Sequence, residues 1–246
     1  MLKKEIDDKI TIPTGDKGVP GERDDMFNPQ HTDPVERYKH LQRYRYAANR
    51  CKGRILDLGC GTGYGSKMLY NKGNEVYGID ISQKAIEYAQ KVYPGPTYIC
   101  CSAENLPFEE EFFDGVVAFE VIEHVQHPEK VLKEIYRVLK KDGNLFISTP
   151  NPRHLKNIFL HYFLGKPYPL KVSEKNVYHV KEFYYEEFIN FLKDKNFTII
   201  SKYGQYLPLF PWPISSILNK ISVKILIYLG YFFPKYSHTV VIYAKK

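Results

Sequence analysis

Apolar and polar residues along this chain follow two periods, one typical of strands and one typical of helices. Short apolar runs bounded by turn residues predict buried strands, whereas apolar positions spaced three and four apart predict helices that cover a sheet. The predicted strands are 54–58, 75–80, 97–101, 114–120, 144–148, 197–204 and 238–246. The predicted helices are 35–49, 64–72, 81–93, 128–141, 182–195 and 214–230.

The order of these elements indicates the fold class. Strands and helices alternate through the first five strands, and such alternation is typical of a parallel, doubly wound α/β sheet. We therefore expect a Rossmann-like seven-stranded sheet, mostly parallel with an antiparallel last strand. Insertions are expected after the fifth strand, at 150–180, and between the last two strands, at 206–236. The expected organisation is an N-terminal arm at 1–34 followed by a single domain at 35–246.

Composition and charge narrow the class of protein only modestly. Hydrophobic residues make up 43% of the chain and charged residues 26%, which excludes a wholly disordered protein. The net charge of +7 suits an anionic partner such as nucleic acid, a membrane surface or a phosphate-bearing substrate, but no dense Lys/Arg run selects among them. The four Cys form no C-x-x-C pair and the N-terminus lacks an apolar segment. We therefore expect reduced thiols, no signal peptide and a cytoplasmic location.

A glycine-rich loop, LDLGCGTGYG (56–65), follows the first predicted strand. Glycines at such a place allow a tight turn and a close approach of the backbone to a ligand, and the following helix presents free N–H groups to it. The spacing is Gly59-x-Gly61-x-Gly63, and a tyrosine stands where the dinucleotide-binding fingerprint has its third glycine. Asp57 precedes the first glycine by two positions, which that fingerprint does not require. Binding of a pyrophosphate is therefore disfavoured.

This loop resembles the D-x-G-x-G-x-G motif of the class I S-adenosylmethionine-dependent methyltransferases. The motif is matched here by Asp57, Gly59, Gly61 and Gly63. The resemblance implies that the loop, including Cys60, holds the methionine part of S-adenosylmethionine. It also implies that an acidic residue at the end of the second strand binds the ribose hydroxyls, and Asp80 stands there with Ile81 beside it. The alternative role for Asp80 is to cap the helix that follows.

A second match to the same family follows the third strand. The stretch CSAENLPF (101–108) is similar to the family's D-A-E-x-L-P-F, with Ser102 in place of the usual Asp. The resemblance implies that Ala103 and Glu104 lie near the adenine, while a serine hydroxyl accepts more weakly than the missing carboxylate. Because the motifs span 54–149 in the family's order, the sequence is identified as a member of this family.

The segment after the fourth strand, FEVIEHVQHP (119–128), contains E-x-x-E-H at Glu120, Glu123 and His124. On a helical turn these three side chains would share one face. The segment is expected at the carboxyl edge of the sheet, where open α/β sheets bind ligands. One interpretation is that Glu120 contacts the cofactor's amino group while the other two begin a helix. A second makes His124 a general base oriented by a carboxylate, and a third makes all three residues ligands of a divalent metal.

The metal interpretation depends on a narrower resemblance. E-x-x-E-H after the fourth strand resembles the metal motif of small-RNA 2′-O-methyltransferases and of some ubiquinone-pathway O-methyltransferases. In the former another His follows the fifth strand, and His179 in NVYHVKEF (176–183) stands at a comparable place, with His154 and His161 as further candidates. The expected metal set is therefore Glu120, Glu123, His124 and His179, with Mg²⁺ or Mn²⁺ as the expected ion and Fe²⁺ or Zn²⁺ also compatible with mixed Glu/His ligation. The catalytic candidates are His124, Glu123 and His179.

The flanks of the motif region indicate an acceptor. TGDKGVPGE (14–22), RYRYAA (43–48) and YHVKEF (178–183) are similar to segments of bacterial and archaeal methyltransferases often associated with glycan assembly. The resemblance implies that the arm folds over the active site and that the acceptor is a small molecule or glycan. We expect O-methylation of a saccharide or lipid-linked glycan hydroxyl, with the insertions at 150–180 and 206–236 forming an acceptor-side lid. The alternatives are a quinone, lipid or RNA ribose acceptor, or a non-catalytic module that binds S-adenosylmethionine.

The sequence also bears on two other kinds of partner, nucleic acid and a membrane surface or second copy of the chain. No RNA-binding module is visible, so nucleic acid is not expected as a partner. The predicted helix in 206–236 has an apolar stripe, but Lys220 and Lys224 interrupt it and its apolar run is far shorter than the roughly 20 residues that span a bilayer. This segment either covers a substrate or a second copy of the chain in a homodimer, or it lies peripherally on the inner face of the membrane.

Overall fold

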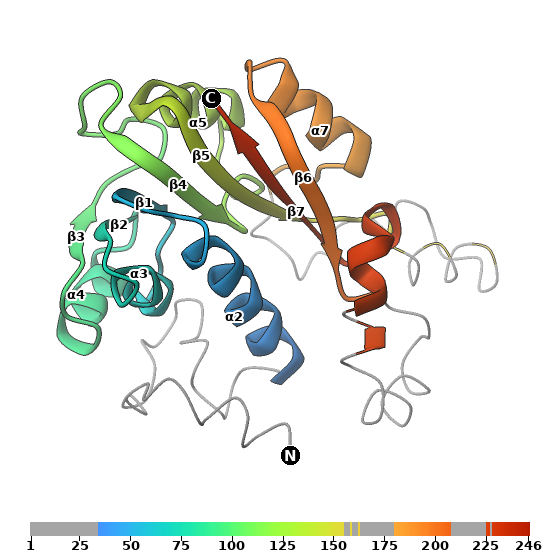
Figure 1. Ribbon diagram of the computed structural model, residues 1–246, viewed down its shortest axis with the longest axis horizontal. Helices are drawn as coiled ribbons and strands as arrows, with labels where there is room; N and C mark the ends of the chain where they lie inside the picture. The colour runs from blue at the N-terminus through green and yellow to red at the C-terminus, as the bar shows by residue number, and fades with distance from the viewer. Residues whose placement is uncertain (1–33, 155–157, 159–161, 163–179, 208–224, 227) are drawn as a thin grey trace.

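The computed structural model describes most of the expected domain and little of the expected arm and insertions (Figure 1). The described residues are 34–154, 158, 162, 180–207, 225, 226 and 228–246. The arm therefore lies outside the described residues except for Pro34, and so do His179 and most of the expected lid. The helix expected over 214–230 is described only from Ile225 onward, where 225, 226 and 228–232 are helical.

A seven-stranded sheet forms the centre of the molecule. Its strands are β1 (Arg54–Leu58), β2 (Glu75–Asp80), β3 (Thr97–Cys100), β4 (Phe113–Phe119), β5 (Leu139–Pro150), β6 (Thr198–Gln205) and β7 (Thr239–Lys245). Their order across the sheet is β3-β2-β1-β4-β5-β7-β6. Strand β7 runs antiparallel to both of its neighbours, and the other pairs are parallel. The Rossmann-like α/β fold with an antiparallel last strand is thus confirmed.

Helices cover both faces of this sheet (Figure 1). They are α2 (Pro34–Ala48), α3 (Tyr64–Tyr70), α4 (Gln83–Val92), α5 (Pro128–Val138) and α7 (Tyr185–Lys193), with a short 3₁₀ turn, η1 (Pro234–Tyr236), before β7. The buried side chains divide into two clusters, one with α2, α3 and α4 and the other with α5 and α7. Along β5, Leu145 and Ile147 join the α5 cluster while Phe146 joins the α2 cluster, as the two-residue period of a strand requires.

The boundary between α5 and β5 differs from the sequence prediction. The helix expected over 128–141 ends at Val138, and β5 begins at Leu139 rather than within 144–148. Leu139 is fully buried and pairs with Phe113 at the start of β4, and the register then shifts before Gly115. Packing of Leu139 within the sheet therefore outweighs its helical spacing, because tertiary contacts override a local pattern.

A buried carboxylate fixes α2 and α3 against β1. Asp57 of β1 is fully buried; its Oδ1 accepts a hydrogen bond from the Tyr44 hydroxyl on α2 at 3.0 Å, and its Oδ2 accepts one from Ser66 Oγ on α3 at 2.6 Å. The close approach of the two helices also requires Gly65, because a Cβ at that position would overlap the Tyr44 ring. The position of α2 over the sheet is therefore set by a few specific contacts.

Asp57 gives the fold a defined pH dependence. Burial raises the pKa of Asp57 to about 7, although the hydrogen bonds from Ser66 and Tyr44 act in the opposite direction. The folded protein then keeps a proton on Asp57 that the unfolded chain releases at about pH 4. The contribution of this group to the free energy of unfolding is therefore fully present below about pH 4 and is lost as the pH rises to about 7. We expect the free energy of unfolding to fall by up to about 4 kcal/mol through this group as pH rises from about 4 to about 7.

Urea unfolding across this pH window measures the effect. Asp57→Asn removes the titrating group while keeping an oxygen that can accept a hydrogen bond, so its free energy of unfolding should depend less steeply on pH than that of the parent. Asp142→Asn, at an exposed position, is the matched control and should keep the parent's slope. Equal slopes for the parent and Asp57→Asn would contradict the assignment.

Candidate active site

The carboxyl ends of β1 and β4 meet at the point where the strand order reverses. From β1 the chain passes outward to β2 and β3 and then returns to β4 on the other side of β1. Ligands of open α/β sheets bind in the crevice outside such a point. The sequence candidates within the described residues lie on β1, at the end of β2, or on the loops that follow β1, β2, β3 and β4, so the fold brings them to one edge of the sheet.

The loop after β1 is open on one side, at Gly61. Gly59, Gly61 and Gly63 have φ angles of 70°, 51° and 87°. A Cβ at Gly61 would meet no atom of the described residues within 4 Å, whereas a Cβ at Gly59 or Gly63 would overlap the side chain of Val121 or Ala89. The outer two glycines thus permit close packing beneath the loop, while Gly61 leaves a cradle that a ligand could enter.

Asp57 and Cys60 lie beneath this loop rather than on its open side. Both side chains are buried, and burial raises the pKa of the Cys60 thiol well above its ordinary value. The Cys60 N–H donates to the Ile79 carbonyl at 2.8 Å, which ties the loop to β2. These two side chains therefore support the loop, and a ligand in the cradle would meet only the backbone of Cys60.

Asp80 ends β2 beside the cradle. Its Oδ2 accepts a hydrogen bond from the Gly61 N–H at 2.9 Å, and its Oδ1 accepts one from the Ser82 N–H at 2.9 Å. Each carboxylate oxygen keeps a lone pair for one more donor, which suits two neighbouring hydroxyls. The Ser82 side chain caps α4 by accepting from Ala85, so capping does not require the Asp80 side chain. Ile81 is 78% exposed and offers an apolar surface next to the carboxylate.

The loop after β3 is fixed by its own polar contacts. Ser102 Oγ accepts a hydrogen bond from the Glu104 N–H at 3.2 Å, and Glu104 Oε1 accepts one from the His127 N–H at 3.0 Å. Glu104 thus joins this loop to the start of α5. Ala103, between Ser102 and Glu104 in the sequence, is half-buried. Ser102 therefore stabilises a local turn, whereas the Asp that the family usually has at this position would place a carboxylate there.

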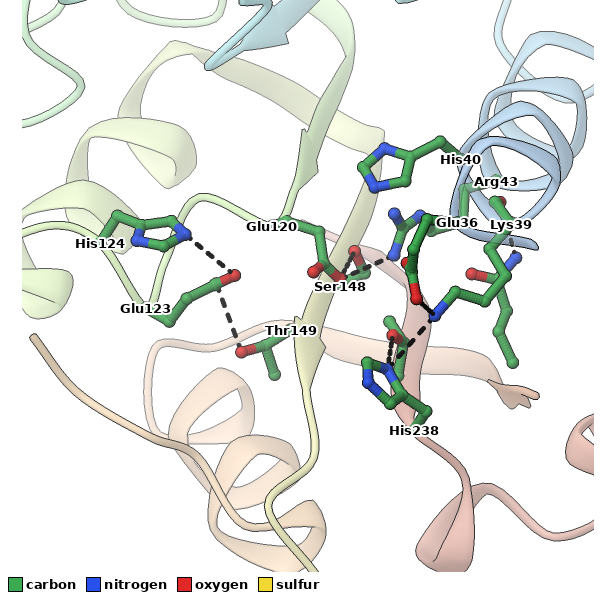
Figure 2. A network of polar contacts seen from close by, with 12 residues as sticks. Glu36, Lys39, His40, Arg43, Glu120, Glu123, His124, Ser148, Thr149 and His238 are labelled. Carbon is green, nitrogen blue, oxygen red and sulfur yellow. Dashed lines mark hydrogen bonds and ion pairs between the residues drawn. The ribbon is translucent and has the colours of Figure 1, made fainter. Parts of the chain in front are cut away.

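Glu120 points toward α2 (Figure 2). Its backbone is left-handed, with φ 58°, which is strained for a residue that has a side chain. Its Oε1 accepts a hydrogen bond from Arg43 Nη1 at 2.6 Å and lies 3.4 Å from Ser148 Oγ. The carboxylate is therefore paired with a cation from α2.

Glu123 and His124 form a separate group on the other side of β5 (Figure 2). Glu123 is buried; its Oε2 accepts a hydrogen bond from the Thr149 hydroxyl at 3.3 Å, and its Oε1 lies 3.5 Å from His124 Nε2. Ser148 and Thr149 are neighbours on a strand and therefore point to opposite faces. Their alternation separates Glu120 from the Glu123–His124 group.

The helical turn assumed for E-x-x-E-H is wrong. Residues 120–124 form a bend and a turn instead of a helix, closed by a hydrogen bond from the His124 N–H to the Val121 carbonyl at 2.9 Å. Because Glu120 has a left-handed backbone, its side chain leaves in a different direction from those of Glu123 and His124. The three side chains do not share one face.

The expected four-residue metal set does not form among the described residues. No group of three or more His, Cys, Asp or Glu within the described ranges could hold an ion, and His179 lies outside those ranges. The Glu120 carboxylate is paired with the Arg43 guanidinium, and it lies on the other side of β5 from Glu123 and His124. The three described members of the expected set therefore do not converge on a point where one metal ion could bind them all.

Arg43 is a candidate site residue that the sequence interpretation missed. Its side chain is 1% exposed, and its Nε and Nη2 atoms are buried without a hydrogen-bond partner among the described residues. Leaving two donors of a buried cation unsatisfied is costly, and a carboxylate that binds two parallel N–H groups is the partner such a guanidinium prefers. The cue in the sequence is spacing: Lys39 and Arg43 lie four residues apart on the buried stripe that also carries Ala47.

Lys39 extends this polar contact toward β7 (Figure 2). Its ammonium donates a hydrogen bond to Glu36 Oε1 at 2.6 Å and lies 3.3 Å from His238 Nδ1. The Gln205 side chain at the end of β6 donates to the Lys39 carbonyl at 3.0 Å. Helix α2 thus connects the loop after β4 with the β6–β7 end of the sheet.

Comparisons with known proteins agree with this architecture. The profile of a methyltransferase domain matches residues 56–147. The chain is 28% identical over 176 residues to a probable S-adenosylmethionine-dependent methyltransferase of Mycobacterium tuberculosis. The aligned region covers 70% of this chain and 60% of that protein. The chain is also 30% identical over 167 residues to the ubiquinone biosynthesis O-methyltransferase of Chromobacterium violaceum. This aligned region covers 66% of the chain and 70% of that protein.

A solved structure shows the same fold. An S-adenosylmethionine-dependent methyltransferase from Mesorhizobium loti aligns with a TM-score of 0.61 over 86% of this chain and 100% of its own, at 15% identity. That identity supports the fold alone, whereas the relative from Chromobacterium violaceum shows similarity in sequence over most of its length. The chain therefore belongs to the class I S-adenosylmethionine-dependent methyltransferases.

Proposed function

We propose that this protein transfers a methyl group from S-adenosylmethionine to a hydroxyl oxygen of a saccharide or lipid-linked glycan. The observation that carries the proposal is the His124 imidazole beside the buried Glu123 carboxylate, at the edge of the sheet where the cofactor loop lies. Transfer to oxygen also agrees with the name of the ubiquinone biosynthesis relative. The saccharide acceptor is supported by the similarity of RYRYAA (43–48) to glycan-associated members of the family.

The residues at this edge fit S-adenosylmethionine. Gly61 supplies an open cradle, and Asp80 presents a carboxylate to the ribose hydroxyls beside the apolar Ile81 surface. Arg43 has two buried donors that find no partner in the part of the chain that the structure describes, and these suit the cofactor's carboxylate, while Glu120 carries the charge that suits its amino group. Ala103 and Glu104 would then lie along the adenine. The fit depends on the cradle and on the Arg43 donors.

When bound, the cofactor supplies a methyl group activated by its sulfonium. The chain's own contribution is to hold the acceptor hydroxyl in line with that methyl carbon and to remove its proton. His124 would take up the proton that the acceptor hydroxyl loses when its oxygen receives the methyl group. Glu123 stabilises the charged imidazole electrostatically, and Thr149 holds the Glu123 carboxylate in place.

A quinone or another lipid phenol is the second candidate acceptor. The observation that favours it is the match to a ubiquinone biosynthesis O-methyltransferase over 70% of that protein. A phenol needs the same proton removal, so the His124–Glu123 group would serve either acceptor. The two candidates therefore differ in the substrate and not in the chemistry of this edge.

Comparison of cell extracts tests the acceptor. Mass spectrometry of envelope glycans and of extracted quinones should be carried out on cells that contain the parent protein, lack it, or carry Asp80→Ala. The proposal expects a methyl ether on a glycan in the parent cells only. A methyl ether confined to the quinone fraction would replace the first candidate by the second, and a new methyl group on nitrogen or carbon would contradict both.

Arg43 is expected to bind the amino-acid part of the cofactor. Arg43→Lys should weaken binding of S-adenosylhomocysteine about tenfold or more, because an ammonium cannot donate two parallel hydrogen bonds to one carboxylate. Methylthioadenosine lacks the amino-acid part and should bind the parent and Arg43→Lys equally. Calorimetry with both ligands separates the roles, and Asp80→Ala should weaken both. If Arg43→Lys weakened both ligands to the same extent, Arg43 would act on the fold and not on the cofactor.

His124 is expected to act on the acceptor only. His124→Asn should lower kcat about 100-fold or more, since general bases contribute on that scale, and should leave S-adenosylhomocysteine affinity unchanged. Glu123→Gln should lower kcat less and alter its pH profile, because the imidazole stays but loses its charged neighbour. Initial rates with methyl-labelled cofactor and the acceptor fraction measure both effects. An undiminished kcat in His124→Asn would exclude the general-base role.

A further inference from the structure

The segment just before β7 exposes a group of large apolar and aromatic side chains. This aromatic patch consists of Ile225, Tyr228, Tyr231, Phe232, Phe233 and Tyr236, whose exposed fractions range from 41% to 65%. Within it the Tyr228 and Phe232 rings lie 5.1 Å apart edge to face, and the Tyr231 and Phe232 rings lie 5.5 Å apart. Exposed apolar side chains gathered on one short segment usually mark an interaction surface.

The aromatic patch is held rigidly on the sheet. The Leu207 N–H donates to the Leu226 carbonyl at 2.9 Å, and both of these side chains are buried. Ser237 Oγ lies within hydrogen-bond distance of the Gly230 and Phe233 carbonyls, at 3.0 and 2.9 Å. One side of the segment is thus packed against the β6–β7 junction, and the other side presents the rings to solvent.

The aromatic patch lies at the same edge of the sheet as the candidate active site. Thr239, the first residue of β7, pairs with Pro150 at the end of β5 and with Gln205 at the end of β6. Since β5 is parallel to β4 and β1, the segment before Thr239 lies at the carboxyl edge. In Figure 1 this segment is the red helix beneath the labels of β6 and β7.

Charge indicates what covers the aromatic patch. The sequence from 206 to 236 contains three Lys and no Asp or Glu, and the whole chain has a net charge of +7. Lys235 lies within the patch segment, and its ammonium is 3.6 Å from Oε1 of the exposed Glu186 side chain. Two copies of this chain would bring like charges together, whereas an anionic surface would be attracted.

We propose that the aromatic patch binds the surface of an anionic lipid bilayer. Tyr and Phe rings partition into the boundary between headgroups and acyl chains, and lysines beside them contact the anionic headgroups. Within the described residues no helix is long and apolar enough to cross a bilayer. The contact is peripheral, and it turns the carboxyl edge of the sheet toward the lipid. It does not depend on methyl transfer.

Vesicle sedimentation tests this contact directly. The full chain should sediment with vesicles of phosphatidylcholine mixed with phosphatidylglycerol, less with phosphatidylcholine alone, and less as salt is raised. The double variant Tyr228→Gln, Phe232→Gln should lower the partition coefficient about tenfold or more, because two exposed rings are removed. Lys235→Gln should lower it about fivefold and reduce the dependence on salt.

Matched measurements separate lipid binding from loss of the fold and from self-association. Ile200→Gln, which replaces a side chain that is 49% exposed on β6, is the control and should sediment like the parent. The thermal midpoint and S-adenosylhomocysteine binding should stay at parent values in all of these variants. The proposal is overturned if the parent fails to sediment with anionic vesicles, or if the double variant sediments equally well. It is also overturned if light scattering finds a parent dimer that the double variant abolishes while no vesicle binding occurs.

Discussion

The buried contact between Arg43 on α2 and Glu120 after β4 is the constraint on which this edge of the molecule depends. Arg43 Nη1 lies 2.6 Å from Glu120 Oε1, and the Arg43 side chain is excluded from solvent. Removing one partner of such a pair costs roughly 3–5 kcal/mol, because an uncompensated charge stays buried. Asp57 holds the same helix through Tyr44. Helix α2 is thereby fixed over the switch point, with two Arg43 donors still available for a carboxylate.

Much of the fold follows from local order in the sequence. Apolar runs and helical spacing were sufficient to predict the sheet, because a strand or helix buried in an α/β layer must carry its own apolar face. Asp80 could be placed beside the glycine loop because both follow neighbouring parallel strands. Arg43 could not be placed in the same way, since its contact with Glu120 joins residues 77 positions apart. Only the packing of α2 brings the two together.

The E-x-x-E-H segment shows where sequence spacing misleads. Spacing places the three side chains on one face only if the backbone is helical. Glu120, the first residue of the motif, has a left-handed backbone, so the segment is not helical from its start. The alternation of Ser148 and Thr149 on β5 then assigns the two carboxylates to different partners. Glu120 neutralises Arg43, whereas Glu123 supports His124. One motif therefore divides into two separate groups, one paired with Arg43 of α2 and the other held by Thr149 on the opposite face of β5.

The most direct test of this account is calorimetric titration of the parent chain with S-adenosylmethionine, compared with Glu120→Gln and Asp80→Ala. The account predicts saturable binding at one site per chain, weakened in both variants, because the proposal assigns the Glu120 carboxylate to the amino-acid part of the cofactor and the Asp80 carboxylate to its ribose. No heat from the parent, or equal affinity in all three proteins, would contradict the assignment of the cofactor to the carboxyl edge of β1, β2 and β4.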